Sequence, residues 1–185
     1  MQKKTQPITK GFFDNEDVRN ELNGLSDRAC LIVGASIVDE LLGRLLSCYL
    51  IGNKKKILKE FMEGGNAALG SFSNKSKACY LLGLISADVF EDIQLIRTMR
   101  NDAAHKLATI SFEETDFKNK VYSLTIVKNL VEPANPKDTF VFEIGLINML
   151  LVDKILKIKR IKTPESDMKF FKEDEHFRKI FYEDN

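Results

Sequence analysis

The apolar residues between positions 26 and 50 recur at steps of three and four, which is the period of an α-helix. The main row consists of Leu31, Ala35, Val38, Leu42, Leu45 and Tyr49. A second row (Cys30, Val33, Ile37 and Leu41) widens the apolar face and leaves Ser36, Glu40, Arg44 and Ser47 on the solvent side. A helix that is apolar over most of its circumference lies inside a domain, so we expect this helix to form the centre of the core.

Capping residues and helix breakers divide the rest of the chain into shorter helices. We expect them over residues 14–22, 54–62, from Ser71 or Ser73 to about 83, 86–106, 112–127 and 139–159. Ser26 and Ser86 precede two of these apolar patterns, and Ser111-Phe-Glu-Glu is a capping-box sequence. No segment alternates as a strand does. The pattern predicts an all-α, single-domain bundle of roughly six to seven helices.

The domain organisation follows from the same pattern. Residues 1–11 are polar and predict a disordered arm, and residues 12–130 predict the helical core. Residues 131–138 contain two prolines and predict a linker, and residues 139–185 predict C-terminal helices that pack on the core or on a partner. The apolar residues of the tail are Phe170, Phe171, Phe177, Ile180 and Phe181. We expect them, together with the apolar helix before them, to complete the core or a homodimer interface, or to form a partner-binding surface.

Composition narrows the class of protein. The chain has 185 residues, of which 44% are apolar, and its 28 Lys and Arg residues against 27 Asp and Glu residues give a net charge of +1. A balanced charge argues against a nucleic-acid binder driven by bulk electrostatics. The three cysteines form no C-x-x-C pair, and the sequence starts with no secretory signal, so we expect reduced thiols in a cytoplasmic protein. No apolar run is long enough for a membrane span.

Motifs for nucleotide and metal chemistry are incomplete. The loop from Gly65 to Gly70-Ser71 lacks the lysine of a phosphate-binding loop. His105 and His176 have no second ligand at metal-binding spacing, so we expect no metal and no cofactor. No serine nucleophile elbow is present, and we do not expect an enzyme.

A DNA-reading helix is not expected either. Residues 83–86 resemble the turn of a helix-turn-helix motif, but the second helix would open with Asp88, Glu91 and Asp92. Three carboxylates facing DNA phosphates would oppose binding. We interpret the basic clusters at residues 54–59 and 154–162 as solvated surfaces, the second at a helix end where cations suit the helix dipole.

Polar residues within or beside the predicted apolar faces of two helices, or at the start of one of them, form the candidate site. They are Asp27, Arg28, Asp39, Arg97, Arg100, Asn101 and His105. Arg100 stands at helical steps from Ile93 and Ile96, and a buried arginine needs a carboxylate or carbonyl partner. We therefore expect a buried network that joins Arg100 to Asp27 or Asp39, with Asn101 or His105 nearby. Such a network either staples two helices together or serves a function.

Five segments in order resemble the bacterial mannitol operon repressor family. They are Ser26-Asp27-Arg28, Asp39-Glu40-Leu41-Leu42, Leu69-Gly70-Ser71-Phe72-Ser73, Leu82-Gly83-Leu84-Ile85 and Arg97-x-x-Arg100-Asn101-x-x-Ala104-His105. The resemblance covers residues 22–117 and departs from the family pattern at Ala68 and Ala103. It implies an all-helical fold and negative regulation of mannitol uptake and metabolism genes. Because no DNA-reading helix is visible, we expect regulation through a protein partner or a bound effector.

An alternative rests on a shorter resemblance. Arg100-Asn101-x-x-x-His105 is similar to the Arg-x4-6-His signature of HEPN-type helical domains. That resemblance implies a metal-independent ribonuclease in which the histidine acts in acid–base chemistry and the arginine stabilises charge on the phosphate. Five residues place Arg100 and His105 about 140° apart on one helix, so the two would converge only across a dimer or at a bend.

Overall fold

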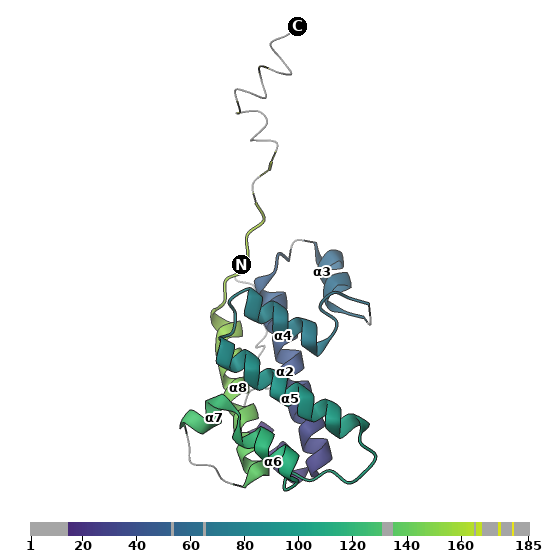
Figure 1. Cartoon of the computed structure of the whole chain (residues 1–185). Helices are drawn as coiled ribbons and strands as arrows, with labels where there is room; N and C mark the ends of the chain where they lie inside the picture. Colours follow the sequence, from purple (N-terminus) through teal and green to yellow (C-terminus); the bar gives the residue numbers. More distant parts are fainter. Residues whose placement is uncertain are drawn as a thin grey trace.

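The computed structural model describes residues 15–52, 54–64, 66–130, 135–164, 166, 167, 174 and 179. Within these residues the chain forms eight α-helices and no β-strand, which confirms the all-α fold (Figure 1). The helices are α1 (Asn15–Gly24), α2 (Asp27–Tyr49), α3 (Lys55–Met62), α4 (Phe72–Leu81), α5 (Ala87–His105), α6 (Thr115–Tyr122), α7 (Thr125–Leu130) and α8 (Pro136–Lys157).

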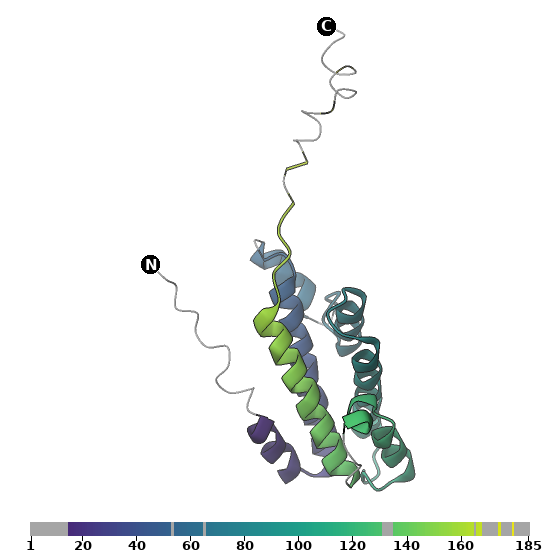
Figure 2. The same cartoon turned by 90° about the vertical axis from the view of Figure 1, so that its left-hand side faces the viewer.

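Helix α2 is the centre of the bundle, as its apolar pattern predicts. It contacts α8 and α1 on one side and α4 and α5 on the other (Figure 2). Ser26 accepts a hydrogen bond from the Ala29 N–H and so caps the first turn. Ten of its residues are buried, so burial of apolar surface from both sides holds this helix in place.

The packing of α2 on α8 depends on a glycine. A Cβ at Gly34 would lie 3.1 Å from the Phe140 ring and 3.2 Å from Ile144, both on α8. The absence of that Cβ lets the two backbones approach closely. The Phe140 ring also packs on the ring of Phe112, with 5.3 Å between centroids, which ties the segment before α6 to the same core.

The region expected as one helix over residues 112–127 is two helices, and this raises the number of helices above the expected range. Ser111 and Glu114 do make capping-box contacts, because the Ser111 N–H donates to the Glu114 carboxylate at 3.0 Å. These contacts belong to the turn before α6, however. A new helix begins at Thr125 because buried Asp92 accepts the N–H groups of Thr125 and Ile126, at 2.7 and 2.9 Å.

Helix α8 begins earlier than the sequence pattern indicates. Asn135 caps it by accepting the Asp138 N–H, and Pro136 occupies the first turn, where its missing N–H is not needed. Residues 136–138 therefore belong to a helix and not to the expected linker. The predicted arm over residues 1–11, linker residues 131–134, His176 and the five apolar tail residues lie outside the described residues. No helix in the described part of the chain is long and apolar enough to span a bilayer.

Candidate functional site

A cleft of about 390 Å³ opens where α2, the start of α4 and α5 meet. Its lining is polar for the most part: Ser36 and Asp39 on α2, Gly70, Ser71 and Ser73 at the start of α4, and Arg97, Arg100 and Asn101 on α5, with Ala35 and Phe72 between them. Four of the seven candidate site residues, Asp39, Arg97, Arg100 and Asn101, therefore share one cleft.

The loop that leads into α4 shapes one wall of the cleft. The Ser71 hydroxyl caps α4 by accepting the Asn74 N–H at 3.1 Å, and the Asn74 side chain donates to the Ala68 carbonyl at 2.8 Å. A Cβ at Gly70 would lie 2.3 Å from the backbone oxygen of Gly64. Only glycine fits at this position without moving the loop, so Gly70 fixes where Ser71 and the first turn of α4 lie.

The two arginines on the opposite wall have neutral partners. The Arg97 Nε donates to the Gln94 side chain at 3.2 Å, and Gln94 donates in turn to the hydroxyl of buried Ser76 at 2.9 Å. Arg100 is exposed, and its Nη1 donates to the Asn101 side chain at 3.0 Å. Among the described residues, neither guanidinium pairs with a carboxylate.

The carboxylate in the cleft is already paired. The Lys75 Nζ donates to Asp39 at 3.0 Å, and the lysine side chain is largely buried. This pair links α2 to α4. Because Lys75 balances Asp39, the charge that the cleft presents comes mainly from Arg97 and Arg100.

The expected burial of Arg100 against Asp27 or Asp39 is wrong. The buried residues of α5 are Val89, Asp92, Ile93, Ile96, Met99 and Ala103. Met99 takes the core position that the pattern assigned to Arg100, and the helix ends at His105, which leaves Leu107 fully exposed. Ile93 and Ile96 are buried as expected, so the core face of α5 lies where the pattern places it, and the error concerns the position of Arg100 beside that face.

Asp27 and Arg28 form a separate group at the first turn of α2. Asp27 accepts the Phe112 N–H at 3.0 Å and lies 3.7 Å from the Lys137 ammonium. Arg28 donates to the carbonyls of Ala103 and Ala108 and so ties the end of α5 to α2. His105 is exposed and does not line the cleft.

Two buried carboxyl groups were missed by the sequence analysis as site residues. Asp92 caps α7, and Glu143 on α8 accepts the Val127 N–H at 2.9 Å. Burial, and then the nearby charge of Asp92, raise the pKa of Glu143 to about 8. The Oε1 of Glu143 is buried without a donor in the described part of the chain, and the raised pKa favours a protonated carboxyl there, which can donate to Asp92. The signal was present in the sequence, since Glu143 stands at helical steps from Phe140 and Ile147 on an apolar face.

The structure defines an all-helical bundle with an arginine-lined cleft. It is similar to a chain in the X-ray structure of the MtlR–HPr complex from Escherichia coli, with a TM-score of 0.63 and 20% sequence identity. The similarity covers 74% of this chain and 97% of that chain, which shows that the fold is MtlR-like. No protein-family model matches the sequence, and no curated protein matches it. Within the described residues, no group of three or more His, Cys, Asp or Glu side chains is placed to hold a metal ion.

Proposed function

We propose that this protein is a regulator of the mannitol operon repressor family and that it acts by binding a protein partner. The observation that carries the proposal is the similarity in fold to the MtlR–HPr complex structure, which covers nearly all of the matched chain. By analogy, the expected partner is the HPr protein of the same organism. The segments that resemble this family support the proposal as well, because four of their residues lie around one cleft: Asp39, Arg97, Arg100 and Asn101.

The surface of α5 supports an indirect mode of regulation. Asp88 and Glu91 are exposed near the start of this helix, where a DNA-reading helix needs cations or neutral donors. Asp92 is not exposed, because it caps α7 inside the bundle. With a net charge of +1, the chain also lacks a general electrostatic attraction to DNA.

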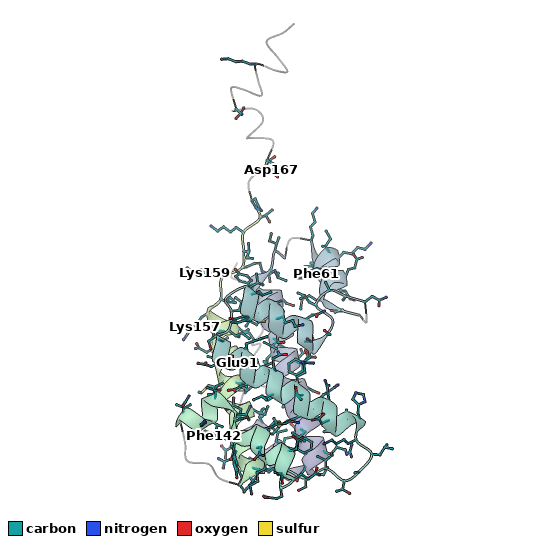
Figure 3. The ribbon with its side chains drawn as sticks, in the orientation of Figure 1. Phe61, Glu91, Phe142, Lys157, Lys159 and Asp167 are labelled. Atoms are coloured by element: carbon teal, nitrogen blue, oxygen red, sulfur yellow. The ribbon has the colours of Figure 1, made fainter. Side chains whose placement is uncertain are left out.

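Exposed apolar side chains on α8 give a partner a surface to bind. Phe142 is 39% exposed, Met149 is 54% exposed and Leu156 is 61% exposed. Phe142, labelled in Figure 3, lies toward the end of the bundle away from α3. Apolar anchors of this kind are common at the centre of protein interfaces.

Calorimetric titration with purified HPr from the same organism tests the proposal. We expect saturable binding with a Kd on the order of micromolar, weakened by a Phe142→Ser, Met149→Ser double substitution. Leu107→Ser is the matched control, because Leu107 is fully exposed in the segment that follows α5.

A gel-shift titration with the DNA upstream of the regulated operon tests the alternative of direct DNA binding. Sequence-specific DNA binding at physiological salt, with no heat from HPr, would contradict regulation through a protein partner.

A ribonuclease is the second candidate function, and one observation favours it. Arg100 and His105 are both exposed, so each is accessible to an RNA phosphate. Incubation of the protein with total RNA without metal, beside His105→Ala, tests this function. Cleavage by the wild type that disappears in the folded variant would assign a HEPN-type nuclease, and intact RNA would exclude it.

A further inference from the structure

The cleft between α2, α4 and α5 has an excess of positive charge that no group in the described part of the chain neutralises. Arg97 and Arg100 both line it, and the Asp39 carboxylate is balanced by Lys75 at 3.0 Å. Each guanidinium has five N–H donors, and within the described part of the chain each makes one hydrogen bond, to a neutral side chain. Most of their donors are therefore available to a ligand.

We propose that this cleft binds a small phosphate monoester. Paired guanidinium groups favour a tetrahedral dianion, because several charge-assisted hydrogen bonds form at once. The volume of about 390 Å³ lies in the range of small-molecule sites and accommodates a phosphate with a short polyol attached.

The start of α4 adds donors on the opposite wall. Phe72 and Ser73 precede the first intrahelical hydrogen bond of α4, which runs from the Lys75 N–H to the Ser71 carbonyl. Their amide groups have no partner within the helix. Ser73 lines the same cleft. Gly70, which has no side chain, lines it as well. Phe72 and Ser73 both line the cleft, so hydroxyl and amide donors are present at the same site as the two arginines.

The remaining polar groups suit the uncharged part of such a ligand. The Asp39 carboxylate is an acceptor, and the Asn101 side chain is both a donor and an acceptor. Both line the cleft. Hydroxyl groups are the ligand groups that both can bind, which favours a phosphorylated polyol over inorganic phosphate. This assignment does not depend on the protein partner, since it uses only groups on this chain.

Thermal unfolding and calorimetry with glycerol 3-phosphate, glycerol, inorganic phosphate and sulfate at constant ionic strength test the proposal. We expect saturable binding of glycerol 3-phosphate, weaker binding of inorganic phosphate and none of glycerol. Arg100→Gln changes an exposed side chain and is expected to leave the fold intact, and it should weaken binding about tenfold or more. Arg97→Gln should do the same. Arg19→Gln is the matched control, because Arg19 is an exposed arginine on α1 outside the cleft.

Three results would overturn the assignment. The first is no saturable binding of glycerol 3-phosphate by the wild-type protein. The second is equal binding of sulfate and glycerol 3-phosphate, which would show a nonspecific anion surface. The third is unchanged binding in folded Arg100→Gln. HPr binding that survives in Arg100→Gln while glycerol 3-phosphate binding is lost would show that the ligand site and the partner surface are separate, and would support the assignment.

Discussion

Replacing Glu143 by glutamine tests the buried carboxyl pair. Glutamine keeps an oxygen for the Val127 N–H and offers an amide N–H to Asp92, so it reproduces the hydrogen bonds of the protonated glutamate without a titratable proton. The pKa of Glu143 is raised from 4.5 to about 8, because the charged form is desolvated and faces Asp92. The folded protein thus binds this proton more tightly than the unfolded chain does.

The magnitude follows from that shift. The contribution of the Glu143 proton to stability is fully present below about pH 4.5, declines by about 1.4 kcal/mol per pH unit as pH rises, and is lost near pH 8. Between roughly pH 5 and pH 7, the wild-type protein should therefore lose on the order of 3 kcal/mol relative to Glu143→Gln. The substituted protein should be the more stable of the two at neutral pH.

Urea unfolding of both proteins at several pH values measures this difference directly. The control is Glu91→Gln on α5, because Glu91 is exposed, beside buried Asp92 in sequence, and labelled in Figure 3. Its stability should follow the wild type at every pH. Parallel curves for the wild type and Glu143→Gln across this range would refute the raised pKa of Glu143.

Three further predictions concern the loop before α4, the end of α5 and the thiols. Gly70→Ala should destabilise the protein by about 1–3 kcal/mol, because the added Cβ would meet the backbone of the loop. Gly24→Ala is the control, since a Cβ at Gly24 has open space around it. Urea unfolding measures the stability of both variants, and equal stabilities would contradict the close approach at Gly70. Arg28→Ala should lower the melting temperature, and Arg28→Lys should recover little of that loss, because two separate carbonyls accept hydrogen bonds from the guanidinium group. A melting temperature equal to that of the wild type in Arg28→Lys would contradict the role of the guanidinium group. Burial raises the pKa of Cys30 and Cys79 to about 12. Both thiols should therefore resist a thiol reagent near pH 8 until denaturant is added. Rapid labelling of either cysteine in the native protein would contradict their burial.

The centre of the fold could be predicted from the sequence because its signals are local. The apolar rows of residues 26–50 and the cap Ser26 operate within a few residues, and the structure has both. Of the two serines expected to start the next helix, Ser71 is its cap. Ser86 precedes α5 as expected, but its side chain makes no capping hydrogen bond. A serine before an apolar pattern thus indicates where a helix begins, even where its side chain makes no capping hydrogen bond.

The exposure of Arg100 on α5 could not be predicted in this way. Met99 and Arg100 are neighbours, and both stand at helical steps from Ile96, so periodicity alone does not decide which one faces the core. The burial of Asp92 on the same helix was not predictable either, because it accepts the N–H of Thr125, more than 30 residues later. A contact of that sequence separation leaves no periodic signal.

The cleft was predictable in part. The sequence pattern singled out Asp39, Arg97, Arg100 and Asn101, and the structure places all four around one cavity. Their partners were not predictable. Lys75, which pairs with Asp39, is 36 residues away from it, and no spacing rule connects two separate helices.

Nuclear magnetic resonance of isotope-labelled HPr tests the central claim most directly. Adding the unlabelled protein should shift or broaden a contiguous set of HPr signals and saturate near a one-to-one ratio. The Phe142→Ser, Met149→Ser variant should need a higher concentration to reach the same effect. An HPr spectrum that stays unchanged with excess wild-type protein would contradict regulation through this partner.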